Sequence, residues 1–273
     1  MLLEGSSIRA TARTVGSDKK TVSDLSKIAG RVALRYQDKH LRNLDLDEIE
    51  LDEVWSFLYA KQKNVEKLKR PRQAGDLWTW IAFCPNTKLV VTWRVGDRTA
   101  ETAMDFLADL ESRLADRIQL TTDGYSPYLE AVESAFGGDV DYAMLSKVAS
   151  REELEIRKQI ISGDPDPDHI STSMVERQNL TLRMSSRRYT RKTNAFSKKI
   201  ENHVLAVALN FLHYNFVRIH SSIRMTPAMA AGVADKLYDL DWILDMVDKA
   251  WPKPNRPKTY KKRKDDGGCD DAS

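Results

Sequence analysis

Apolar side chains recur every three to four residues over roughly the first 40 positions of the chain, a period typical of helices packed on one face. The series consists of Ile8, Ala12, Val15, Val22, Leu25, Ile28 and Ala29. Gly16 interrupts it at a place suited to a turn, so the pattern predicts two short helices joined by a tight connection. Ser17 or Asp18 is expected to cap the second helix, because either side-chain oxygen can accept a bond from a free amide at the helix start.

From residue 49 the pattern changes to short β-rich runs separated by turn residues. The predicted strands are Ile49–Tyr59, Leu77–Phe83, Lys88–Val95, Ile118–Thr122 and Tyr142–Leu145. The tetrapeptide Cys84–Thr87 has hairpin chemistry, so it is expected to join the second and third strands as an antiparallel pair. Lys61–Arg72 is predicted to be a basic loop between the first two strands.

Helical periodicity returns between and after these strands. Thr99 is expected to begin a helix with one apolar face, formed by Ala103, Phe106, Leu107, Leu110 and Leu114. A second helix is predicted over Tyr125–Ala135, and a loop over residues 162–170 precedes a third, capped by Ser171 or Thr172. The pattern then predicts a long helical stretch whose core-facing stripe is Phe196, Ile200, Val204, Val207 and Phe211.

This order of elements is that of a ribonuclease-H-like fold. We therefore expect an α/β protein with a mixed sheet and flanking helices, preceded by a small helix-turn-helix segment and followed by long helices. Acids from the first strand, the end of the fourth strand and a late helix converge in that fold, and here they would be Asp52, Asp123 and Glu176. Any one of the 40 acidic residues is more simply a surface carboxylate. Three converging carboxylates suit hard divalent cations, which are used in pairs to cut or join phosphodiesters.

The formal net charge of +3 hides a separation of charge along the chain. Eight Lys or Arg residues and no acid lie between Arg177 and Lys199, and seven and no acid lie between Lys253 and Lys264. Either run alone is as easily a solvated face. Two such runs beside a phosphodiester-cutting site favour a polyanionic partner. The tail from Trp251 onward is predicted to be extended or disordered.

Cysteine usage and hydropathy indicate where the protein works. Cys84 and Cys269 lie far apart and offer neither a disulfide framework nor a metal-binding pair, which fits a reducing cytosol. No apolar run is long enough to cross a membrane, and the first residues lack the apolar stretch of a signal peptide. We therefore expect a cytoplasmic protein with no membrane partner.

Five blocks of the chain resemble the DDE transposases of the insertion-sequence-one type, small enzymes of bacterial and archaeal mobile elements. The blocks are Asp52–Phe57, Gly96–Thr99, Thr122–Tyr128, Val175–Arg183 and Arg191–Lys198. They occur in order over most of residues 50–205, and each alone is a weak signal. The resemblance implies a catalytic triad that binds two Mg²⁺ or Mn²⁺ ions, formed by Asp52, Asp123 and Glu176.

The resemblance also implies residues that contact DNA. Asn179 and Arg183 follow Glu176 by three and seven positions, so on a helix they project toward the same cleft. Further matching positions, expected to contact the DNA backbone or to support the active site, are Arg191, Lys192 and His203. A histidine taken alone is more often a partly buried packing residue.

Residues 1–42 are expected to form a helix-turn-helix that binds DNA, followed by a catalytic domain over 46–235 and a C-terminal helix with a basic tail over 236–273. In the first segment Lys19, Lys20 and Thr21 would lie near bases or phosphates. The alternative is that these helices belong to an ordinary bundle.

Two features depart from the family pattern. Family members commonly carry a Cys-rich zinc-binding segment ahead of the helix-turn-helix, and no such segment is present here, so either the start is trimmed or end recognition works without zinc. The interval of 53 residues from Asp123 to Glu176 is longer than in the best-known members. Its insert, around Ser150–Asp168, is expected to be a helix plus a loop.

The predicted function is DNA transposition, in which the ends of a mobile element are cut and transferred into target DNA. The expected partner is double-stranded DNA, both terminal repeats and target, and a homodimer or higher oligomer is expected because two ends must be brought together. One alternative is a nuclease of the same fold without strand transfer. Another is a DNA-binding regulator whose acidic site no longer works.

Overall fold

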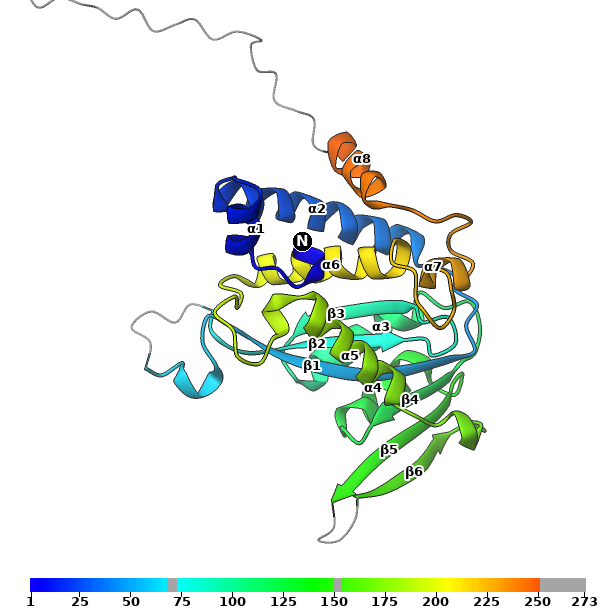
Figure 1. Cartoon of the computed structure of the whole chain (residues 1–273). Coiled ribbons are helices and arrows are strands. Elements are labelled where there is room, and N and C mark those ends of the chain that lie inside the picture. Colours follow the sequence, from blue (N-terminus) through cyan, green and yellow to red (C-terminus); the bar gives the residue numbers. More distant parts are fainter. Residues whose placement is uncertain (68–72, 150–153, 251–273) are drawn as a thin grey trace, which may run out of the picture.

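The protein folds around a six-stranded mixed sheet, seen in a computed structural model that describes residues 1–67, 73–149 and 154–250 (Figure 1). In spatial order the strands are β3 (Val90–Gly96), β2 (Gly75–Phe83), β1 (Glu48–Leu58), β4 (Gln119–Asp123), β5 (Asp141–Ala149) and β6 (Leu154–Ser162). The first three form an antiparallel meander, β4 and β5 continue parallel to β1, and β6 returns antiparallel to β5. This sheet, flanked by helices, agrees with the predicted ribonuclease-H-like class.

Helices cover both faces of the sheet (Figure 1). They are α1 (Ile8–Thr14), α2 (Lys19–His40), α3 (Ala100–Glu111), α4 (Pro127–Phe136), α5 (Ser173–Ser185), α6 (Ile200–Phe216), α7 (Pro227–Ala230) and α8 (Leu240–Ala250). Short 3₁₀ turns occur at Leu2–Glu4, Gln62–Asn64, Pro167–His169 and Arg187–Tyr189. Alternation along β2 divides the core: Trp80 packs with α3 and α4, whereas Ile81 packs with α5 and α6.

Two helices joined by a turn lie near the start of the chain, as predicted, but only the first of them is short. Ser7 caps α1 and Asp18 caps α2 with side-chain oxygens that accept backbone N–H bonds of 3.1 and 2.7 Å. Gly16 adopts a φ of 65°, which a residue without a Cβ tolerates best. The second helix then continues for 22 residues and runs along α6 (Figure 1). At Gly30 an added Cβ would lie 2.3 Å from the Leu205 carbonyl oxygen, so the close approach of α2 to α6 requires glycine.

All five predicted strands are present, but two other expectations are wrong. The insert expected to hold a helix forms β6 instead, because the open edge of β5 offers unpaired backbone groups to it. The long helix expected after Glu176 is broken, since α5 ends at Ser185 and α6 begins only at Ile200. Between them the chain pairs with the end of β1, where the Tyr59 N–H donates to the Ser197 carbonyl at 2.8 Å.

Phe196 lies in that connection and therefore outside the predicted helical stripe. The predicted tail from Trp251 onward lies outside the described residues, as does part of the predicted basic loop Lys61–Arg72, whereas the expected C-terminal helix is present as α8. Within the described ranges, no helix combines the length and the hydropathy needed to span a bilayer.

Candidate active site

The parallel pairing of β1 and β4 brings two of the predicted acids together. Glu50 is in register with Thr121, so two residues further along each strand Asp52 and Asp123 lie level. Carboxylate oxygens of Asp52, Glu53 and Asp123 all lie within 4.8 Å of one another. Residues that are 71 positions apart in the sequence, Asp52 and Asp123, thus lie side by side on adjacent strands.

Hydrogen bonds hold the Asp52 carboxylate in place. Its Oδ1 accepts from the Glu53 N–H at 2.8 Å, and its Oδ2 accepts from the Asn179 amide on α5 at 2.7 Å. The pKa of Asp52 is raised to about 6, chiefly because the side chain is largely buried, and the charges of Asp123 and Glu176 add to the rise. The site therefore concentrates negative charge that its neighbours only partly offset.

Glu176 reaches the same region from α5. It precedes Asn179 by three residues, so the two side chains lie on one face of the helix, and Asn179 contacts Asp52 directly. The Thr172 hydroxyl donates to a Glu176 oxygen at 3.2 Å. Glu176 is exposed, and its charge contributes to the raised pKa of Asp52. Glu176 is thus close enough for its charge to act on Asp52, but it is not one of the three carboxylates that lie within 4.8 Å of one another.

A second buried acid, Glu50, fixes where α5 begins. The Glu50 side chain points to the same face of β1 as Asp52, and it accepts the Val175 N–H at 2.7 Å. Burial raises the pKa of Glu50 to about 7, although the amides at the start of α5 lower it. Glu50 and Asp52 lie two residues apart on β1, which is about 6 to 7 Å along a strand. Their partners Val175 and Asn179 lie four residues apart on α5, which is about 6 Å along a helix, so both contacts form at once.

Two further residues of the site, Glu53 and Arg98, lie within the blocks that resemble the family but were not predicted from the sequence. The Glu53 side chain is only 1% exposed, and neither of its oxygens has a hydrogen-bond partner of ordinary geometry among the described residues. Burial raises the pKa of Glu53 to about 7, while the nearby Tyr128 hydroxyl and the Arg98 guanidinium lower it. Arg98 forms ion pairs with Glu53 at 3.3 Å and with Asp123 at 3.5 Å.

Comparison with known proteins places the chain in a family. The chain is 30% identical to the insertion element iso-IS1n protein InsB of Shigella dysenteriae over 154 residues, which is 56% of this chain and 86% of that protein. The chain belongs to the InsB family. No model of a protein family matches it. Membership of the InsB family supports a transposase-type assignment, and the acidic cluster is a group that could hold a metal ion.

In this InsB-family chain the predicted DNA-contacting residues of α5 face the acids. Asn179 is buried and bonded to Asp52. Arg183, one turn further on, is near both Asp52 and Arg191: burial lowers the pKa of its guanidinium, and the Arg191 charge lowers it further. Arg191 and Lys192 are exposed on the connection between α5 and α6. Four of the predicted positions therefore lie on or beside the helix that carries Glu176.

His203 occupies a different kind of place. Its ring is 0% exposed, with Nε2 at 2.9 Å from the Tyr189 hydroxyl and Nδ1 at 2.9 Å from the Ser197 hydroxyl. Burial lowers the pKa of His203 to about 3, helped by the charge of Arg188. A buried ring cannot contact a DNA backbone, so of the two predicted roles the structure favours support. His203 ties the connection between α5 and α6 to α6.

This burial predicts a pH-dependent stability contribution. An unfolded His203 takes a proton near pH 6.5, whereas the folded ring resists it until about pH 3, so its stabilising contribution is complete above pH 6.5 and is lost as the pH falls. At pH 5 the loss should reach about 2 kcal/mol. Urea unfolding at pH 7.5 and pH 5 should show this loss of unfolding free energy in the wild type, and His203→Gln should lack it. Equal pH responses of the two proteins would contradict the assignment.

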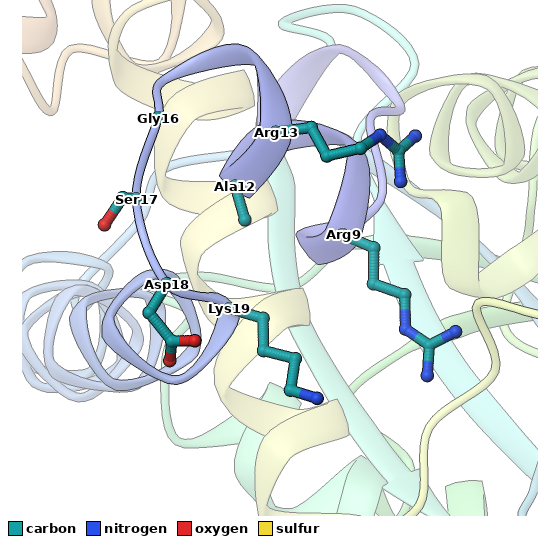
Figure 2. Close-up of a pocket in the computed structure, with 7 residues that line it drawn as sticks. All are labelled: Arg9, Ala12, Arg13, Gly16, Ser17, Asp18 and Lys19. Atoms are coloured by element: carbon teal, nitrogen blue, oxygen red, sulfur yellow. The ribbon is translucent and has the colours of Figure 1, made fainter.

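The three positions predicted to contact DNA in the N-terminal helices, Lys19, Lys20 and Thr21, are all exposed at the start of α2. Lys19 also lines a hollow of about 460 Å³ beside the turn, together with Arg9 and Arg13 of α1. Figure 2 shows these three cationic side chains extending to the same side of the turn. Within the described part of the chain, Arg9, Arg13 and Lys19 have no ion-pair partner. Asp18 is the one acid that lines the same hollow, so positive charge predominates at the turn.

Proposed function

We propose that the protein is a DDE transposase that cuts DNA at the ends of a mobile element and joins those ends to target DNA. The observation that carries the proposal is the meeting of Asp52 and Asp123 at adjacent strand positions, under the helix that bears Glu176. Membership of the InsB family supports the same reading. The proposal includes a cytoplasmic, nucleoid-associated enzyme that acts as a dimer or larger assembly, because two element ends must meet.

The residues present fit divalent metal ions. All donors at the site are carboxylate oxygens, which suit Mg²⁺ or Mn²⁺ and not zinc. Burial without ordinary hydrogen bonds is costly for the two Glu53 oxygens, and the Arg98 guanidinium at 3.3 Å offsets that cost only in part, since the pKa of Glu53 stays raised. Asp52, Asp123 and Glu176 would hold two ions, with Glu53 beside them. Such ions activate an attacking oxygen and neutralise charge on the leaving oxygen of a phosphodiester.

The remaining residues orient the acids and hold the DNA. Asn179 keeps one Asp52 oxygen turned toward α5, and Thr172 restrains Glu176. Arg183, Arg191 and Lys192 would bind backbone phosphates as the DNA passes over α5. Binding through such contacts releases counterions, so the affinity should fall steeply as salt rises.

The N-terminal helices would recognise the element ends. Lys19, Lys20 and Thr21 start the second helix of a helix-turn-helix, the position from which such motifs contact bases and phosphates. Arg9 and Arg13 add two charges on the adjacent helix, lining the same hollow as Lys19 (Figure 2). A duplex backbone with regularly spaced phosphates suits this set of separated cations.

If the cations around this hollow bind DNA phosphates, removing two of them should change the affinity for DNA. Replacing both Arg13 and Lys19 by Ala should weaken binding to duplex DNA and lower the slope of log affinity against log salt by roughly two, about one for each lost phosphate contact. Fluorescence anisotropy over a series of salt concentrations measures this slope. Lys39→Ala, at the exposed far end of α2, is the matched control and should leave the slope unchanged.

A strand-transfer assay tests the function itself. The protein is incubated with Mg²⁺, a labelled duplex carrying the DNA that flanks its own gene, and a supercoiled target plasmid. We expect cleavage at the element ends and labelled ends joined to the plasmid. Cleavage without joining would favour a nuclease, and specific binding without cleavage in either Mg²⁺ or Mn²⁺ would favour a regulator; either result would overturn the proposal.

A further inference from the structure

Arg98 lies in the connection between β3 and α3 and points at the acidic cluster. Its Nη2 atom is 3.3 Å from a Glu53 oxygen and 3.5 Å from an Asp123 oxygen. The side chain is 33% exposed, whereas that of Glu53 is 1% exposed. Arg98 thus joins two of the clustered acids while part of its guanidinium remains open to solvent.

Two aromatic rings hold the Arg98 head group in this position. The guanidinium carbon lies 4.0 Å from the centre of the Tyr125 ring and 5.2 Å from that of Trp78. The Tyr125 hydroxyl also donates to the Arg98 carbonyl at 2.9 Å, and the Tyr125 N–H donates to Asp123 at 3.0 Å. Tyr125 therefore fixes Arg98 and Asp123 relative to each other, a degree of order that a loosely solvated surface arginine lacks.

The contacts of Arg98 leave most of its hydrogen-bonding capacity unused. A guanidinium carries five N–H donors, and within the described residues only Nη2 donates a hydrogen bond, the long one to Asp123. The planar fork of an arginine matches two oxygens of a phosphate better than a lysine does. An ordered, partly open arginine among carboxylates that would bind metal ions therefore has donors to spare for a phosphodiester.

We propose that Arg98 binds a DNA phosphate at the acidic site, and that in the absence of DNA its charge competes with divalent cations for Glu53 and Asp123. The inference rests on the proposed function. Two effects of opposite sign follow from a single side chain. Arg98 weakens metal binding by the free protein because like charges repel, and it strengthens DNA binding at the same site.

Calorimetric titration with Mn²⁺ in the absence of DNA tests the first effect. Arg98→Gln removes the charge with little change in length and should bind Mn²⁺ roughly tenfold more tightly than the wild type. Arg98→Lys keeps the charge and should bind Mn²⁺ like the wild type. Arg94→Ala is the control, since Arg94 pairs with Asp105 and not with the cluster. Unchanged or weaker Mn²⁺ binding by Arg98→Gln would overturn the inference.

Anisotropy with a duplex tests the second effect. Arg98→Gln should lower the salt slope of DNA binding by about one, and Arg98→Lys should restore that slope but leave strand transfer at least tenfold below wild type because its ammonium lacks the fork. An unaltered slope in Arg98→Gln would also overturn the inference. Asp123→Asn distinguishes failure of this inference from failure of the proposed function. If Asp123→Asn binds Mn²⁺ as tightly as the wild type, the proposed function fails. If Asp123→Asn binds Mn²⁺ more weakly while Arg98→Gln binds it like the wild type, only the role of Arg98 is refuted.

Discussion

Asp123→Asn is expected to lower metal-dependent cutting and joining of DNA by on the order of a thousandfold, because about 4 kcal/mol of transition-state stabilisation depends on a correctly held metal pair. The amide keeps the shape of the carboxylate and loses its charge. Products of a labelled element end, separated on a denaturing gel over a time course with Mg²⁺, give both rates. Asp116→Asn, an exposed acid just before the opposite end of β4, is the matched control and should keep full activity.

The same variant should not lose stability. The Asp123 charge contributes to the raised pKa values of Asp52 and Glu53, so removing it relieves repulsion in the metal-free protein. Thermal melting without metal should give an unchanged or slightly higher melting temperature. The increase in melting temperature that Mg²⁺ produces in the wild type should be smaller in the variant. Full activity, or a stabilisation by Mg²⁺ equal to that of the wild type, would argue against a role of Asp123 in binding metal.

Glu50→Ala is expected to disturb the active site from beneath α5. It leaves the buried Val175 N–H without its acceptor, at a cost of about 1 to 3 kcal/mol. It also frees the first turn of α5, which carries Glu176, and a displacement of about 1 Å at a catalytic group costs roughly a hundredfold in rate. Hydrogen exchange read by NMR should show faster exchange at Val175 and its neighbours than in the rest of the core.

Glu50→Gln separates the shape of this side chain from its charge. The amide oxygen can still accept the Val175 N–H, so exchange at α5 and activity should stay near wild type. Since the folded pKa of Glu50 is about 7 and its unfolded value is about 4.5, the charged form is disfavoured on folding, and its contribution to stability falls as pH rises between these values. The Gln variant should lack that fall. Equal exchange at Val175 in the Ala variant and the wild type would contradict a docking role.

Local sequence determined most of the elements of this protein. Apolar residues at alternating or three-to-four spacing, and caps such as Asp18 and Thr99, specify strands and helices through contacts within a few residues, so these elements were predictable. The positions of Asp52, Asp123 and Glu176 on those elements also followed, because each acid sits at a strand or helix that the pattern marks.

Tertiary structure decided what lies between and around those elements. The β6 strand forms because β5 presents an open edge, and the break before α6 forms because Ser197 pairs with the end of β1. Likewise Glu53 and Arg98 join the acidic cluster, and His203 is buried, through contacts between residues distant in the chain. Such pairings depend on which surfaces come into contact when the chain folds, and the local periodicity of a sequence does not specify those contacts.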